Sequence, residues 1–128
     1  MRVLLDTHTL LWFAAGSPKL SVTALDLLEG EHSEAVLSVA SLWEIAIKVS
    51  VGRLHLGGDY NAAMAVHLQK ADAALLPISL SHCAVVAGLP YHHRDPFDRL
   101  IAAQALAERI PLLSADTAFD AYGVERIW

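Results

Sequence analysis

Cysteine is nearly absent from the 128-residue sequence, since Cys83 is the only one, and a disulfide within the chain is excluded. This composition fits a protein of a reducing compartment, and we expect it in the cytoplasm. Long apolar runs are also absent, because no stretch approaches the ~20 residues that a membrane span needs. Asp6 and His8 interrupt the apolar N-terminus, which argues against an export signal. We therefore expect no membrane association.

Positive charge is scarce as well. Nine Lys and Arg residues stand against 14 Asp and Glu residues, which gives a formal net charge of −5. Proteins that bind nucleic acids are usually basic, so this balance disfavours a nucleic-acid partner unless metal ions or a basic partner offset it. Apolar residues are abundant, at 55% of the chain. A small protein of this composition often covers some of its surface with another subunit or a partner.

Short apolar runs alternate with helical patterns along the chain, and no repeat or linker interrupts them, so we read residues 1–128 as a single domain. Strands are expected at residues 2–6, 35–39, 74–78, 111–116 and 124–128. Helices are expected at residues 9–16, 21–30, 41–52, 59–71, 81–89 and 95–110, with one or two helical turns at 117–123. Pro77 places its strand at a sheet edge or a strand end. The alternation predicts an α/β domain with a mainly parallel central sheet and helices on both faces.

Four acidic residues stand where the predicted strands end or the following helices begin. Asp6 and Asp116 end strands, whereas Glu44 and Asp98 lie in the first turns of helices. Because parallel strands bring their carboxyl ends to one edge of the sheet, we expect the four side chains to gather there. At ~5 Å and an effective dielectric constant of ~20, each pair of carboxylates costs on the order of 3 kcal/mol. A fold that gathers them normally supplies a cation or raises a pKa.

Each acid also has a purely structural explanation. Ser41 and Glu44 fit a capping box. The aspartates could cap a helix or interact favourably with its first turn; they are Asp6, Asp95, Asp98 and Asp116. Asp95 precedes Pro96, a residue suited to the first helical position, and is best interpreted as an N-cap. Capping alone does not require an acid directly after a buried strand four times over.

Hard oxygen ligands without an accompanying cysteine favour Mg²⁺ or Mn²⁺. Such a site suits the hydrolysis of a phosphodiester, because the metal binds phosphate oxygens and lowers the pKa of a water. We expect Asp6 and Asp98 to coordinate the metal directly. Asp116 would bind it or a second metal, and Glu44 would orient or deprotonate the attacking water.

A zinc site is the alternative metal centre, with ligands drawn from His92, His93, Asp95 and Asp98. It is less favoured, because adjacent residues rarely point at the same position and no HExxH or Cys/His pattern is present.

Further residues are candidates for supporting roles. Thr7 and Ser114 could hydrogen-bond the carboxylates, and His8 could line the rim of the site. Basic residues that could lie near its mouth and contact a phosphate of the substrate are Lys48, Arg53, Arg94 and Arg99, and Lys48 could instead pair with Glu44. Apolar residues that could serve the core, a dimer face or a groove for a partner peptide are Leu10, Leu11, Trp12, Phe13, Leu42 and Trp43.

Four sequence blocks resemble the signature blocks of PIN-domain ribonucleases, and most closely the VapC-type toxins of toxin–antitoxin pairs. They are LLDTHTLLW, SVASLWEIAIK, HRDPFDRLIAAQA and LLSADTAF, and the similarity runs from Val3 to Trp128. The resemblance implies an α/β/α sandwich and a metal-dependent endoribonuclease. It also implies frequent homodimers and a cognate antitoxin that blocks the active site. It places the four acids of the family on Asp6, Glu44, Asp98 and Asp116.

Three alternatives from other classes fit less well. A haloacid-dehalogenase-like phosphatase needs a second Asp two residues after the first, where this chain has His8. A receiver-type signalling domain needs an acidic pair at the first strand and a lysine near the last, and neither is present. A catalytically silent PIN-fold interaction module is disfavoured because all four acids are retained.

Overall fold

The computed structural model describes residues 1–128, and its five strands form one sheet in the order β3-β2-β1-β4-β5. The strands are β1 (Arg2–Leu5), β2 (Glu34–Ser38), β3 (Ala74–Leu76), β4 (Leu112–Leu113) and β5 (Arg126–Ile127). The helices are α1 (Thr7–Ala15), α2 (Val22–Glu29), α3 (Val39–Ser50), α4 (Tyr60–Ala71), α5 (Leu80–Gly88), α6 (Pro96–Glu108) and the 3₁₀ helix η1 (Thr117–Tyr122). All neighbouring strands are parallel, so the α/β prediction is confirmed and the sheet is entirely parallel.

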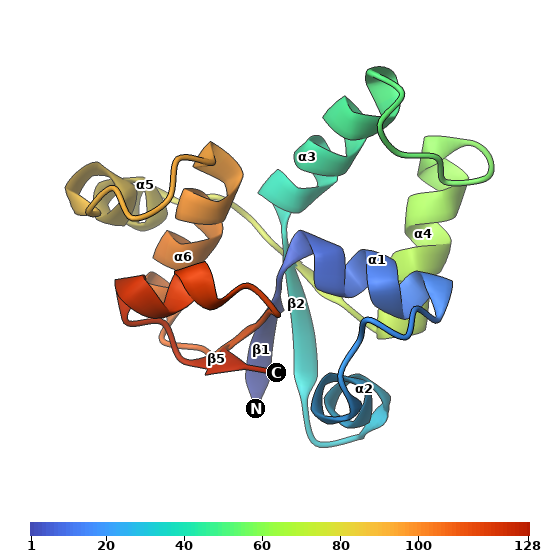
Figure 1. The fold of residues 1–128 in the computed structure, drawn as a ribbon, viewed down its shortest axis with the longest axis horizontal. Coiled ribbons are helices and arrows are strands. Elements are labelled where there is room, and N and C mark those ends of the chain that lie inside the picture. The colour runs from blue at the N-terminus through green and yellow to red at the C-terminus, as the bar shows by residue number, and fades with distance from the viewer.

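Helices cover both faces of the sheet, as Figure 1 shows, with α5, α6 and η1 on one side and α1, α3 and α4 on the other. The alternation of side chains along β1 explains the two layers of core. Val3 and Leu5 pack in one cluster with Leu10 of α1, whereas Leu4 packs in the opposite cluster with Ile101 of α6. β1 is thus buried on both faces, as a central parallel strand must be.

Two helices begin earlier than the sequence pattern indicated. α1 begins at Thr7, because Asp6 has the extended backbone of an N-cap residue directly after β1. α3 begins at Val39, because the hydroxyl of Ser38 accepts a hydrogen bond from the backbone N–H of Ala40 at 3.1 Å. In both places the chain passes from strand to helix without a loop. This holds the first residues of each helix close to the sheet edge.

Strand β3 has the position at the side of the sheet that Pro77 predicted. β3 is the outermost strand on its side, and it ends at Leu76, directly before Pro77. Proline cannot donate a hydrogen bond to a neighbouring strand, so the strand stops there. No helix of the structure has the length and apolar character that crossing a membrane requires.

Helix α6 packs closely on the sheet and carries Asp98 in its first turn. Its buried face is rich in alanine, with Ala102, Ala103 and Ala105 all nearly inaccessible. The carboxylate of Asp95 accepts hydrogen bonds from the backbone N–H groups of Phe97 at 2.8 Å and Asp98 at 3.4 Å. The prediction that Asp95 caps this helix is therefore confirmed.

Candidate active site

A cleft of about 310 Å³ opens at the carboxyl edge of the sheet. Its lining includes three of the four predicted acids, Asp6, Asp98 and Asp116. The remaining lining residues are His8, Trp12 and Ala115, so His8 does border the site as predicted. The acids come from the end of β1, the start of α6 and the loop after β4. These segments meet because the strands that precede or neighbour them are parallel.

Asp6 is 6% exposed and lies at the floor of the cleft. Its side chain makes no capping hydrogen bond to α1, so the capping explanation fails for this residue. Instead, Oδ2 accepts a hydrogen bond from the hydroxyl of Ser114 at 2.7 Å, as one of the supporting predictions expected. Burial raises the pKa of Asp6, and the hydrogen bond from Ser114 and the nearby His8 oppose that rise.

Glu44 is buried beside this group, and polar side chains hold both of its carboxylate oxygens. Thr7 donates a hydrogen bond to Oε1 at 2.7 Å, and Lys48 lies 2.9 Å from Oε2. The predicted pairing of Lys48 with Glu44 is thus confirmed. The capping-box explanation is wrong, because Ser38 caps α3 and Ser41 lies inside the helix. The hydroxyl of Ser41 instead contacts that of Thr7 at 2.8 Å.

Asp98 carries the most strongly shifted pKa of the cleft. Burial is the largest cause and raises the pKa of Asp98 to about 7. Repulsion from Asp95 and Asp6 acts in the same direction, with a smaller contribution from Glu44. His93 opposes the rise. Three neighbouring carboxyl groups therefore add to the effect of burial in disfavouring the ionisation of Asp98.

Asp116 follows β4, and one of its oxygens has a structural role. Oδ1 accepts a hydrogen bond from the backbone N–H of Ala118 at 2.9 Å and caps η1, so the capping explanation holds for this residue. The backbone N–H of Asp116 donates to the hydroxyl of Ser114 at 3.0 Å. Because the same hydroxyl donates to Asp6, Ser114 ties the two acids together.

His93 lies between the two more exposed acids. Its Nε2 is 3.1 Å from Oδ2 of Asp98 and 3.5 Å from Oδ2 of Asp116. The donor atoms of these three residues lie within 4.8 Å of one another and could hold a metal ion. His93 was predicted only as a possible zinc ligand, because it shortly precedes Asp95 and Asp98 in the sequence. His92 does not join it, because its ring packs edge-on against Tyr122 with the centroids 5.1 Å apart.

These donors fit a divalent cation. Carboxylate oxygens suit Mg²⁺ and Mn²⁺, whereas the imidazole of His93 suits Mn²⁺ or Zn²⁺ better than Mg²⁺. Burial is the largest cause of the raised pKa values of Asp6 and Asp98, and a divalent ion in the cleft would favour the ionised form of both carboxyl groups.

Two of the predicted basic residues have other positions than expected. Arg99 is 6% exposed, and its guanidinium donates hydrogen bonds to the backbone carbonyls of Pro90 at 2.8 Å and Leu89 at 3.1 Å. Arg99 therefore holds the loop before α6. The prediction that it lies near the mouth of the site is wrong. Arg53 lies in a neighbouring groove. Arg94 is exposed and directly follows His93 in the chain.

The apolar candidates divide between the core and the surface. Leu10 and Phe13 are buried in the core, so they form neither a dimer face nor a groove. Trp43 is 65% exposed, and its ring meets Phe97 edge-on at 5.6 Å. It belongs to an exposed apolar stripe at a spacing of four residues along α3 and just beyond, made of Val39, Trp43, Ile47 and Val51.

An all-parallel sheet with acids gathered at its carboxyl edge is the arrangement that the sequence blocks implied. A sequence profile of the PIN domain matches residues 3–125. The match covers nearly the whole chain, and the chain therefore belongs to the PIN-domain family.

Several solved structures of VapBC proteins are similar to this chain. The crystal structure of VapBC2 from Rickettsia felis, bound to a DNA fragment from its promoter, matches with a TM-score of 0.76 and 16% identity, over 99% of this chain and 98% of the other. VapBC-1 from nontypeable Haemophilus influenzae matches with a TM-score of 0.69 and 18% identity, over 99% and 97%. VapBC-5 from Mycobacterium tuberculosis matches with a TM-score of 0.61 and 21% identity, over 98% and 95%. A comparison with curated protein sequences finds no significant match.

Proposed function

We propose that this protein is a metal-dependent endoribonuclease that hydrolyses RNA phosphodiester bonds, and that it is the cytoplasmic toxin of a toxin–antitoxin pair. One observation carries the proposal: Asp6, Asp98 and Asp116 share a cleft, with Glu44 buried beside them. Four acids from four segments meet at one sheet edge, and two of them have raised pKa values. Helix capping accounts for only one of the four.

In this proposal Asp6, Asp98 and Asp116 hold Mg²⁺ or Mn²⁺, and His93 moves aside or becomes a further ligand. When bound, the ion neutralises charge on the phosphate and activates a water for attack. Ser114 keeps the carboxylate of Asp6 oriented through its hydrogen bond. Asp116 has one oxygen engaged in the η1 cap, so Oδ2 is the atom that remains for the ion.

Glu44 orients the attacking water and can accept its proton. Thr7 and Lys48 each engage one oxygen of the carboxylate, and each oxygen keeps a further lone pair. These two contacts fix the position of the Glu44 carboxylate, which favours the orienting role.

The partners follow from the similar complexes and from the surface. Several similar structures are VapBC complexes, which supports a cognate antitoxin as the partner of this chain. The exposed α3 stripe supports a homodimer, because a contiguous apolar surface of this kind is usually covered in solution. RNA as the substrate rests on the PIN-domain family and on the chemistry of the acidic cleft.

The direct test is cleavage of total cellular RNA by the purified protein, with Mg²⁺ or Mn²⁺ and with a chelator. Cleavage that requires the ion is expected, and mapping of the new RNA ends names the target. The melting temperature should also rise with either ion, because the ion binds only the folded site. Ion-independent cleavage, or no cleavage of any RNA with either ion, would contradict the proposal.

A further inference from the structure

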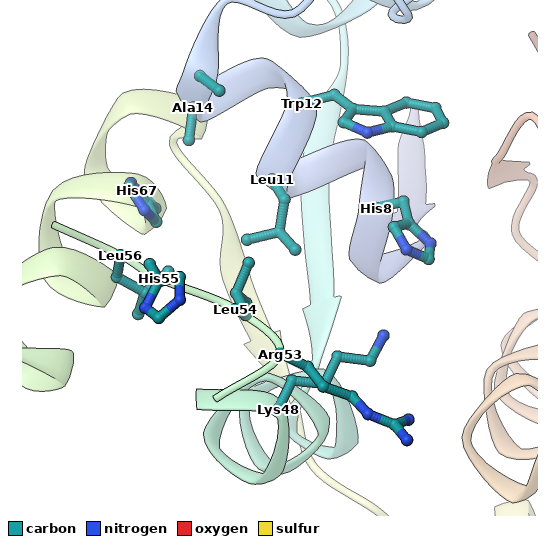
Figure 2. Close-up of a pocket in the computed structure, with 11 residues that line it drawn as sticks. His8, Leu11, Trp12, Ala14, Lys48, Arg53, Leu54, His55, Leu56 and His67 are labelled. Carbon is teal, nitrogen blue, oxygen red and sulfur yellow. The ribbon is translucent and has the colours of Figure 1, made fainter. Parts of the chain in front are cut away.

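A second cavity, which we call the cationic groove, adjoins the acidic cleft. It has a volume of about 570 Å³ and lies between α1, α4 and the segment after α3. Figure 2 shows Leu11 and Leu54 in the middle of this groove, with His55 and His67 on one side and His8 on the other. The groove therefore combines an apolar floor with polar nitrogen-bearing side chains.

No carboxylate lines the cationic groove. Its charged residues are Lys48 and Arg53, and its three histidines are either neutral or positive. Lys48 already pairs with Glu44, but the guanidinium of Arg53 has no hydrogen bond or ion pair in the structure. In a chain of formal net charge −5, this cavity is lined by an unpaired arginine and by no acid, which favours a negatively charged ligand there.

The backbone fixes the place of Arg53. Helix α3 ends at Ser50, and Gly52 then adopts a left-handed conformation with φ of 76°. The N–H groups of Arg53 and Leu54 both donate to the carbonyl oxygen of Lys48, at 2.9 and 3.2 Å. This helix-terminating turn holds Arg53 close to Lys48, and Figure 2 shows both side chains leaving the backbone toward the right of the view, with their nitrogen ends apart.

The groove is continuous with the acidic cleft. His8 and Trp12 line both cavities, so an extended ligand that leaves the acids at one end passes these two residues and enters the groove. A single strand of nucleic acid fits this path, because its phosphates suit the charge of Arg53 and its bases can lie on the apolar floor. Surfaces that bind single strands combine positive side chains with aromatic rings on which bases stack, and Arg53 and Trp12 supply one of each here.

We infer that the cationic groove binds the single-stranded RNA segment next to the scissile phosphate, with Arg53 holding a phosphodiester and Leu11, Leu54 and Trp12 contacting a base. This assignment rests on the proposed ribonuclease function and deepens it. Sequence preference at the neighbouring nucleotide would then depend on the apolar floor.

The test measures binding without cleavage. A short fluorescein-labelled single-stranded RNA of mixed sequence is titrated with protein in EDTA, and anisotropy gives the Kd at several salt concentrations. Arg53→Glu should weaken binding about tenfold, because a charge-assisted contact to phosphate is lost. The slope of log Kd against log salt should become shallower by about 0.7 for the lost phosphate contact.

Arg109→Glu is the matched control. Arg109 is an exposed arginine beyond the end of α6, outside the groove and the cleft, and its substitution makes the same change of net charge. Equal RNA affinities for the two variants would overturn the assignment of the groove, and so would an absence of RNA binding by the wild-type protein. Arg53→Gln, which removes the charge without reversing it, should show a smaller loss than Arg53→Glu.

Cleavage kinetics separate this assignment from the proposed function. Arg53→Glu should raise KM with little change in kcat, because the contact lies away from the reacting atoms. If the wild type cleaves RNA and Arg53→Glu behaves like Arg109→Glu, the groove assignment fails and the ribonuclease proposal stands. A variant that loses affinity only for an acidic partner protein, with RNA binding unchanged, would assign the groove to that protein instead.

Discussion

The acidic cleft has two halves that are held in different ways. Asp6 and Glu44 are buried, and neutral hydroxyls and Lys48 fix their carboxylates. Asp98 and Asp116 are more accessible, with side chains 19% and 42% exposed, and both face His93. In the first half, buried hydroxyls and Lys48 hold the carboxylates in place. In the second half, the imidazole of His93 lies between the two carboxylates, where a cation could replace it. Ion binding should therefore reorganise the second half far more than the first.

The largest effect should come from removing an ionisable acid from either half. Asp6→Asn and Asp98→Asn should each lower RNA cleavage by about 10³-fold or more, since charge stabilisation of the transition state is lost. Cleavage is measured with saturating Mg²⁺ or Mn²⁺, and circular dichroism checks the fold. Asp26→Asn, on the exposed face of α2, is the control for a charge change and should keep full activity. Wild-type activity in Asp98→Asn would remove that residue from the site.

A smaller loss should follow when the supports of the buried half are removed. Thr7→Val deletes the hydroxyl that donates to Glu44 and contacts Ser41. Loss of such a supporting hydrogen bond typically costs about 10–100-fold in activity. Thr7→Ser keeps the hydroxyl and should remain close to wild type in kcat. If Thr7→Ser is impaired and Thr7→Val is not, packing of the threonine methyl group matters and the hydrogen bond does not.

The stability of the protein without divalent ions should reveal the free-energy cost of ionising Asp98 in the folded state. The pKa of Asp98 is about 7 in the folded protein, against an ordinary value of 3.8. Between these values the folded state binds more protons than the unfolded state, so stability falls as the pH rises. Asp98→Asn removes this penalty. In EDTA its melting temperature should exceed that of the wild type by a few degrees at pH 8, and the difference should vanish near pH 4. A constant difference across this range would contradict the assigned cause.

The smallest effect is expected from His93, which contacts only the accessible half. His93→Ala should change kcat at saturating metal by no more than about threefold, because the cation takes over the balance of charge between Asp98 and Asp116. The concentration of Mn²⁺ that gives half-maximal activity is measured alongside. A loss as large as that of Thr7→Val would make His93 a required ligand and erase the contrast between the two halves.

The sequence predicted the arrangement of the acids because one rule of parallel sheets decides it. Asp6 and Asp116 follow buried strands, so they lie at this edge of the sheet whether or not they also cap a helix. The choice between Ser38 and Ser41 as the cap of α3 could not be made locally, since both are serines near the helix start. The roles of the two serines differ because of a contact with a distant part of the chain: the hydroxyl of Ser41 contacts that of Thr7, which follows another strand.

Residues whose roles depend on loops were predicted least well. Arg99 has helical neighbours that suggest a solvent-exposed position, but the loop at residues 89–91 folds back and surrounds its guanidinium with carbonyl groups. His93 reaches Asp98 and Asp116 only because the same loop returns to the cleft before Asp95 caps α6. Neither loop path follows from hydrophobic periodicity, which describes helices and strands and says nothing of the segments between them.

The hydrogen bond between Ser114 and Asp6 joins positions 108 residues apart. β1 is synthesised long before β4, its neighbour in the sheet. A growing chain on the ribosome therefore holds an incomplete cleft until β4 and the residues that follow it have emerged, since such distant pairing forms late. For an enzyme proposed to cut RNA, this order of assembly delays activity until the segment with Ser114 and Asp116 has left the ribosome.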